Sequence, residues 1–75
     1  MEDLFSTDLA VNNQHAVYRV VFDDDKYMFL PNAGTSFPTF SFRREHDEWK
    51  DQELLAPELK KQAIDALEQY LLKQH

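Results

Sequence analysis

The stretch that decides the fold is PELKKQAIDALEQYLLK, residues Pro57 to Lys73. On a helix that turns by about 100° per residue, its apolar side chains fall on one face and most of its polar side chains on the other. The apolar face consists of Leu59, Ala63, Ile64, Ala66, Leu67, Tyr70 and Leu71. Pro57 suits the first helical turn, where its missing N–H has no partner, and Lys73 complements the helix dipole at the other end. We therefore predict one amphipathic helix.

A single helix of this length is marginal in water, so its apolar face has to pack on another element. Residues 15–50 supply that element, because they are rich in the β-branched and aromatic residues that strands favour. We predict strands over 15–22, 26–30 and 39–44, and Trp49 either starts a short fourth strand or packs under the helix. The fold class is therefore α+β: an antiparallel meander of three to four strands with the C-terminal helix on one face, in the order β-β-β-(β)-α.

The register of the first predicted hairpin follows from its turn. If Asp24 and Asp25 form a two-residue turn, Asp23 lies opposite Lys26, which is a favourable cross-strand pair. This register collects one apolar face, formed by Tyr18, Val20, Phe22, Tyr27 and Phe29. In the third strand the alternation turns Phe40 and Phe42 inward and Thr39, Ser41 and Arg43 outward.

The segments between the strands and the helix carry two further signals. Pro31 is predicted to end a strand, and residues 32–36 to form a loop with the only glycine of the chain, Gly34, which we expect at a positive φ. Leu54 and Leu55, just before the helix, are predicted to reach the core.

The second face of the predicted sheet is less polar than water-facing strands usually are. It carries Arg19 together with four apolar residues, Val17, Val21, Met28 and Leu30. Something is therefore expected to cover this face, either the N-terminal arm or a second subunit. These four residues form the candidate interface.

Residues 1–14, MEDLFSTDLAVNNQ, are predicted to be an N-terminal arm, and residues 15–75 a single α+β domain. Leu4, Phe5 and Leu9 have roughly helical spacing, and Ser6-Thr7-Asp8 can cap a short helical turn. We expect either a loosely attached tail, flexible or with a short helix, or an arm that covers apolar surface.

The composition restricts the class of protein. Eight basic and fourteen acidic residues give a formal charge of −6, which repels phosphate backbones and anionic lipids, so we expect no nucleic-acid or membrane partner. No long apolar run suggests a signal peptide or a membrane span. The chain has no cysteine, which excludes disulfides and cysteine zinc sites and favours a cytoplasmic location. Ten aromatic residues indicate a folded domain rather than a disordered acidic chain.

The order of elements, with Lys60-Lys61-x-Ala63 in the last helix, superficially resembles the double-stranded RNA-binding domain, which presents basic residues there to phosphates. Here Glu58 precedes the lysines, the glycine-rich approach is absent and the chain is acidic. The sequence therefore does not support that assignment.

We find no pattern typical of catalysis, cofactor binding or metal binding. His46 lies among carboxylates, but neighbouring residues in a tight turn point apart and do not converge on one site. Residues 23–25 lack the ligand spacing of a calcium loop. No serine lies in a nucleophile elbow, and one glycine cannot build a phosphate-binding loop. His15 and His75 lie at the ends of elements and are expected in solvent.

The sequence therefore favours a small acidic, non-enzymatic protein–protein interaction module that forms a homodimer or binds another protein. One alternative is a domain that binds a small anionic metabolite through a polar rim of Arg43, Arg44, His46 and Trp49. Another is an acidic inhibitor or decoy of a basic partner, with the carboxylates Asp23, Asp24, Asp25, Glu45, Asp47 and Glu48.

Overall fold

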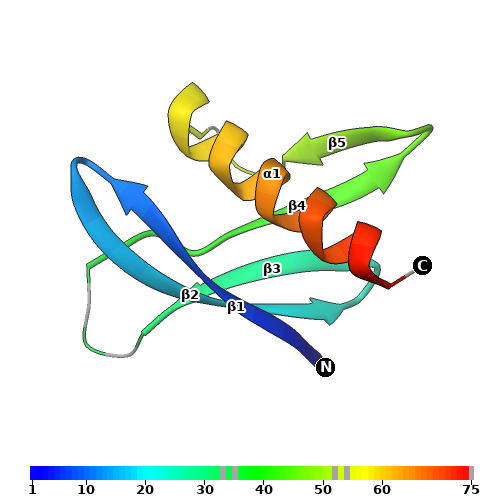
Figure 1. Ribbon diagram of the computed structural model, residues 1–75, viewed down its shortest axis with the longest axis horizontal. Coiled ribbons are helices and arrows are strands. Elements are labelled where there is room, and N and C mark those ends of the chain that lie inside the picture. Colours follow the sequence, from blue (N-terminus) through cyan, green and yellow to red (C-terminus); the bar gives the residue numbers. More distant parts are fainter. Residues whose placement is uncertain (33, 35, 52, 54, 75) are drawn as a thin grey trace.

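The computed structural model describes residues 1–32, 34, 36–51, 53 and 55–74. The elements are β1 (Glu2–Val11), β2 (Gln14–Asp23), β3 (Lys26–Pro31), β4 (Phe40–Glu45), β5 (Glu48–Asp51) and α1 (Pro57–Lys73). The strands form one antiparallel sheet in which each strand pairs with the next along the chain (Figure 1). The predicted α+β meander with a C-terminal helix is confirmed, and the short fourth predicted strand exists as β5.

The predictions for Leu54 and His75 fall outside the described residues. Leu55 is partly buried against the core, as predicted. Gly34 has a φ of 85°, the left-handed conformation expected of it.

The predicted hairpin register is confirmed, because Asp23 pairs with Lys26 across β2 and β3. Asp24 and Asp25 have φ values of 54° and 61°. Positive φ at both central residues gives the turn whose twist matches that of the flanking strands. The turns at residues 12–13 and 46–47 have the same conformation, with φ between 51° and 65°.

The prediction that residues 1–14 form a helical or flexible arm is wrong. Residues 2–11 form β1, which pairs with β2 along the edge of the sheet and does not lie across its second face. The strand alternates, with Leu9 and Val11 buried and Asp8 and Ala10 exposed. Leu4, Phe5 and Leu9 have a spacing similar to that of a helix because a register shift between Asp3 and Phe5 interrupts the alternation of the strand. β1 therefore belongs to the same domain as the rest of the sheet.

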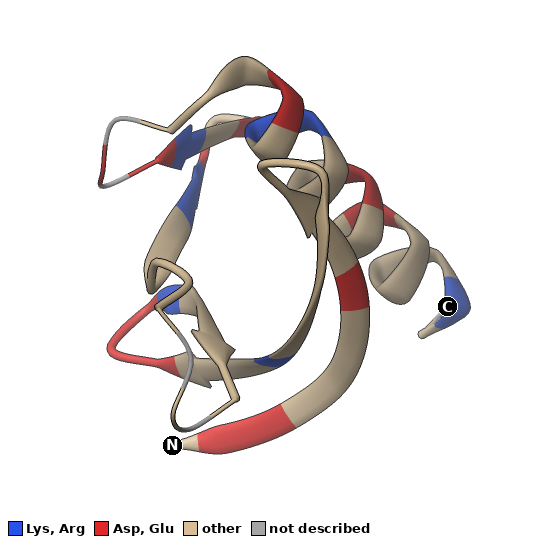
Figure 2. Cartoon of the chain, turned by 90° about the vertical axis from the view of Figure 1, so that its left-hand side faces the viewer, with Lys and Arg blue, Asp and Glu red and all other residues tan. Residues whose placement is uncertain are grey.

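The core lies between the inner face of the strongly curved sheet and the helix (Figure 2). It is formed by Leu9, Val11, Ala16, Tyr18, Val20, Phe29, Phe40, Phe42, Leu59, Ala63 and Leu67. Phe29 and Phe40 stack with ring centres 4.8 Å apart. The Tyr18 hydroxyl donates a hydrogen bond to the Pro38 carbonyl at 2.6 Å, and burial raises the pKa of this side chain.

One residue of β4 departs from the predicted alternation. Ser41, expected to face solvent, is only 6% exposed. Its backbone N–H donates to Glu53 Oε2 at 3.0 Å, just beyond the end of β5. The Glu53 carboxylate therefore accepts the hydrogen bond of a β4 backbone N–H that lies beyond the end of β5 at Asp51.

Candidate interaction surfaces

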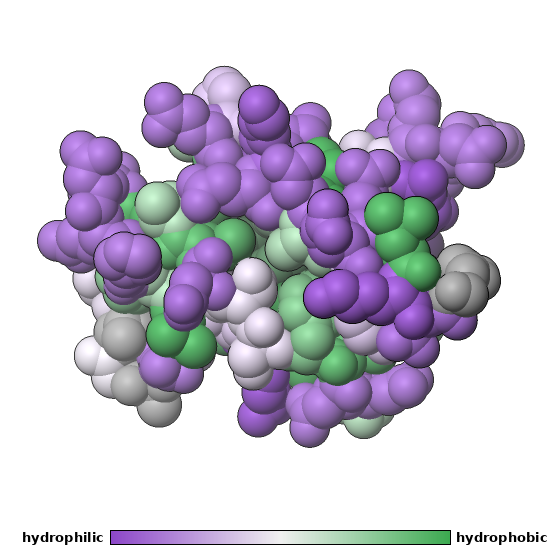
Figure 3. All heavy atoms as spheres, in the orientation of Figure 1, coloured by the Kyte–Doolittle hydropathy of each residue, from purple (hydrophilic) through white to green (hydrophobic). Residues whose placement is uncertain are grey.

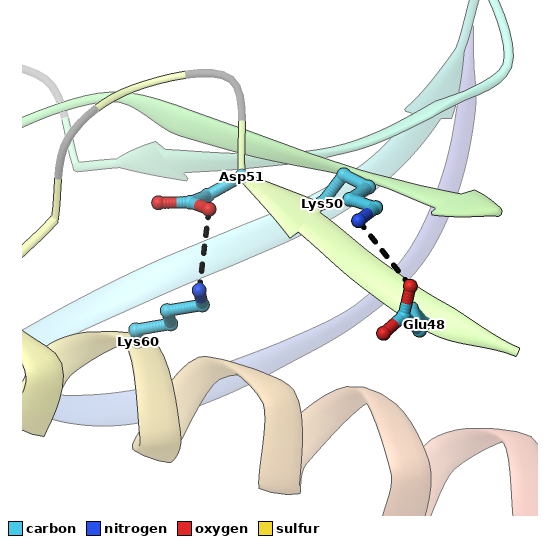
Figure 4. Close-up of polar contacts among 4 residues, drawn as sticks. All are labelled: Glu48, Lys50, Asp51 and Lys60. Atoms are coloured by element: carbon cyan, nitrogen blue, oxygen red, sulfur yellow. Dashed lines mark ion pairs between the residues drawn. The ribbon is translucent and has the colours of Figure 1, made fainter.

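The N-terminal half of α1 is fixed between the two edges of the sheet. On one side, the Gln62 amide forms two hydrogen bonds with the backbone of Ala10 in β1. On the other side, Lys60 Nζ lies 3.3 Å from Asp51 Oδ1 at the end of β5 (Figure 4). The neighbouring Lys50–Glu48 pair, at 3.3 Å, stays within β5.

The C-terminal half of α1 lies against β1 instead of the β4–β5 hairpin. Tyr70 stacks on Phe5 with ring centres 4.8 Å apart and 18° between the ring planes. A cleft of about 400 Å³ remains between the helix and the hairpin. It is lined by Arg44 and Trp49 from the hairpin and by Asp65, Glu68, Gln69, Leu71 and Leu72 from the helix.

Two smaller clefts adjoin the first one. A cleft of about 330 Å³ is lined by Phe22, Asp25, Tyr27, Arg43, Arg44 and Glu45. A third, of about 240 Å³, is lined by Glu2, Leu4, Phe22, Tyr27, Tyr70, Leu71 and Gln74. Because the three share lining residues, we treat them as one depression and call it the end trough. Its lining comes from residues at and beside the β2–β3 turn, from the β4–β5 hairpin and from the C-terminal half of α1. In Figure 1 the two turns and the end of α1 lie on the right.

The aromatic wall of the end trough centres on Trp49. Arg44, its cross-strand partner, places Cζ 4.6 Å from the centre of the Trp49 ring, a cation–π contact. Tyr27 and Phe42 hold the ring edge-on from the core side, with centres 5.4 and 6.4 Å away. The Trp49 Nε1 atom is buried, and no described residue accepts a hydrogen bond from it. Packing against other rings therefore fixes the position of Trp49.

The charges around the end trough are predominantly negative. The lining includes five carboxylates, from Glu2, Asp25, Glu45, Asp65 and Glu68, and two guanidinium groups, from Arg43 and Arg44. None of the ion pairs between described residues involves any of these seven side chains. Their charges are therefore available to a partner.

The structure brings together only part of the predicted polar rim. Arg44 and Trp49 share the first cleft, and Arg43 lines the second. His46 is exposed in the β4–β5 turn and lines none of the clefts in the end trough.

Sequence reasoning missed the helical wall of the end trough. Asp65, Glu68 and Leu72 lie on the side of α1 that faces the hairpin, and Leu72 is 69% exposed. The available signal was a leucine outside the apolar face of the helix. Figure 3 shows that hydrophobic residues reach this face of the molecule in separate places among hydrophilic ones.

The outer face of β2 and β3, opposite α1, is the second candidate surface. Val17 is 45% exposed, and Met28 and Leu30 are half-buried. Val21 pairs with Met28 but is fully buried and lies outside the core cluster, so its side chain is not available to a partner. Arg19 Nε reaches Asp3 Oδ1 at 3.1 Å across β1 and β2.

No group of three or more histidine or acidic residues in the described part of the chain could hold a metal ion. In that same part, no helix is long and apolar enough to cross a membrane. No protein-family model matches the chain, and comparisons with curated proteins and with solved structures found no match either.

Proposed function

We propose that this protein is a small acidic interaction module that acts through its surface rather than by catalysis, and that it forms a homodimer. The contact is the outer face of β2 and β3. The supporting observation is the exposure of Val17 beside half-buried Met28 and Leu30, on the sheet face that α1 leaves open. Apolar residues on an open sheet face are stabilised when a partner removes them from water.

A second copy of the chain suits this face because its charges are self-complementary. Asp8 pairs with Val17 in the β1–β2 register, and Arg19 follows two residues later on the same face. Arg19 and Asp8 are both exposed. In a two-fold symmetric contact the same surface of each copy faces the other copy, so Arg19 of one copy, which pairs with Asp3 of its own chain, can also lie beside Asp8 of the other copy. The absence of cysteine from the sequence supports a cytoplasmic location for this module.

The test is the mass in solution, measured by size-exclusion chromatography with light scattering. The protein is expected at twice its 8.9 kDa chain mass, and Val17→Asp at the mass of one chain. Leu72→Asp is the matched control, since it puts the same charge on an exposed apolar position of the opposite side and should leave the dimer intact. A single-chain mass at the highest soluble concentration would refute the proposed dimer.

Binding of an anionic metabolite has less support. Arg44 beside Trp49 offers a cation and a flat ring to such a ligand. However, the five carboxylates that line the end trough would repel it. We expect no rise in melting temperature with inorganic phosphate or citrate, whereas a bound ligand would stabilise the folded state.

A further inference from the structure

We propose that the end trough binds a cationic amphipathic segment of a partner protein. An apolar side chain of that segment would pack against Trp49 and Leu72, and its lysine or arginine side chains would lie beside Asp65 and Glu68. This surface is separate from the outer sheet face, so the inference does not depend on the proposed dimer.

The first cleft leaves apolar surface open to solvent. Leu72 is 69% exposed, although it faces a half-buried tryptophan across the cleft. The cleft, at about 400 Å³, lies in the size range of sites that bind ligands, roughly 300–1,000 Å³. Tryptophan is among the residues that contribute most to binding when a partner covers them. An apolar side chain inserted between Trp49 and Leu72 would exclude water from both.

Negative charges lie next to this apolar surface. Asp65, Glu68 and Leu72 are spaced by three and four residues, so one side of α1 presents two carboxylates in line with the apolar contact. Neither carboxylate has an ion-pair partner among the described residues. The lining as a whole and the chain, at −6, are both acidic, which attracts a cationic segment over longer distances.

The two walls of the cleft carry opposite charges. Arg44 is on the hairpin wall of the cleft, opposite the carboxylates of the helix wall. It lies on the Trp49 ring and has no carboxylate partner among the described residues. A segment with basic residues on one side and an acidic or uncharged residue on the other would therefore bind in one orientation. This separates the site from a surface that collects any cation.

The experiment uses the fluorescence of Trp49, the only tryptophan of the chain and a wall of the cleft. The probe is a short synthetic peptide of leucine and lysine in helical amphipathic order. Two control peptides replace either every leucine by serine or every lysine by glutamate. Titration of the peptide should change the Trp49 emission and give a saturable Kd. Neither control peptide should do so at the same concentrations.

Three variants locate the contact. Leu72→Asp and the double variant Asp65→Asn/Glu68→Gln should each raise the Kd by about fivefold to tenfold. The double variant Glu58→Gln/Asp47→Asn makes the same change in net charge with residues that do not line the end trough, and should leave the Kd within about twofold. Circular dichroism and thermal melts verify that each variant is folded.

Three results would overturn the proposal. An equal loss of affinity in the charge-matched control would show diffuse attraction instead of a site. Equally tight binding of the serine–lysine peptide would exclude the apolar contact. An unchanged Trp49 emission at saturation would place the peptide elsewhere. Light scattering on the same samples tests the dimer independently. Leu72→Asp should weaken peptide binding but leave the dimer intact. Val17→Asp should leave peptide binding unchanged but dissociate the dimer.

Discussion

The side-chain amide of Gln62 pairs with the backbone of Ala10 as a neighbouring strand would. Gln62 Oε1 accepts a hydrogen bond from Ala10 N at 2.9 Å, and Gln62 Nε2 donates one to Ala10 O at 3.1 Å. Ala10 lies in β1, the edge strand, and no strand of the described residues pairs with the outer backbone groups of β1. Unpaired edge groups invite pairing with other chains, so α1 both packs on the core and protects the edge of the sheet.

Gln62→Ala is therefore expected to lower the free energy of unfolding by about 1 kcal/mol, because two partly exposed hydrogen bonds are lost. Gln62→Glu should also destabilise, since a carboxylate can accept from Ala10 N but cannot donate to Ala10 O. Urea unfolding measures both. Gln69→Ala, an exposed change on the same helix, should stay within about 0.5 kcal/mol, and an equal loss there would contradict the role of Gln62.

Two leucines of α1 should respond differently to the same substitution. Leu67 is fully buried against the sheet, so Leu67→Ala should cost about 2–5 kcal/mol through lost burial and the cavity that remains. Leu72 is 69% exposed, and Leu72→Ala should change stability by less than about 0.5 kcal/mol. Chemical denaturation of the two variants under one condition makes the comparison. Similar losses would mean that α1 packs on a different face.

Ionisation of the Tyr18 hydroxyl should lower the free energy of unfolding in alkaline solution. Burial raises its pKa above the ordinary value of 10.0, so the unfolded chain loses the phenolic proton at a lower pH than the folded one. The contribution of the neutral Tyr18 side chain to the free energy of unfolding is complete below about pH 10. It is lost as the pH rises through the raised pKa of the folded state. Unfolding experiments from pH 8 upward on the original chain and on Tyr18→Phe measure the difference in stability between the two proteins.

The Phe variant removes the hydroxyl that donates to the Pro38 carbonyl at 2.6 Å. It should be less stable by about 1 kcal/mol at neutral pH. Its deficit should shrink as the pH rises past 10, because only the tyrosine-containing protein has this ionisable group. If the difference in free energy of unfolding between the two proteins stays constant across that range, the ionisation of Tyr18 is not coupled to unfolding.

The β4–β5 turn offers a stabilising change. His46 and Asp47 have φ values of 51° and 65°, a conformation that asparagine and glycine adopt more easily. The double variant His46→Asn/Asp47→Gly should raise the free energy of unfolding by about 0.5–1 kcal/mol. Glu48→Gly, in the extended backbone of β5, should lower it by a similar amount. If the double variant and Glu48→Gly both destabilise the protein, the positive φ values of His46 and Asp47 do not lower its stability.

The candidate surfaces were predictable to different degrees. The outer-face residues Val17, Met28 and Leu30 could be grouped in advance because alternation along a strand assigns each side chain to a face. The burial of Val21 on that same face could not, because it depends on side chains packed around it from neighbouring strands. The pairing of Arg44 with Trp49 required the β4–β5 register, and their position opposite Asp65 and Glu68 required the direction in which α1 crosses the sheet.

By itself, the sequence determined the helix at residues 57–73, its buried face and the Asp24–Asp25 hairpin, since helical periodicity and turn conformation depend on residues close together in the chain. Only the tertiary structure decided that residues 2–11 join the sheet, that Gln62 completes its edge, and that a cleft stays open beside Trp49. Each of these depends on contacts between distant segments, such as Ala10 and Gln62, which are 52 positions apart in the sequence. No local pattern specifies where a helix will lie between two sheet edges.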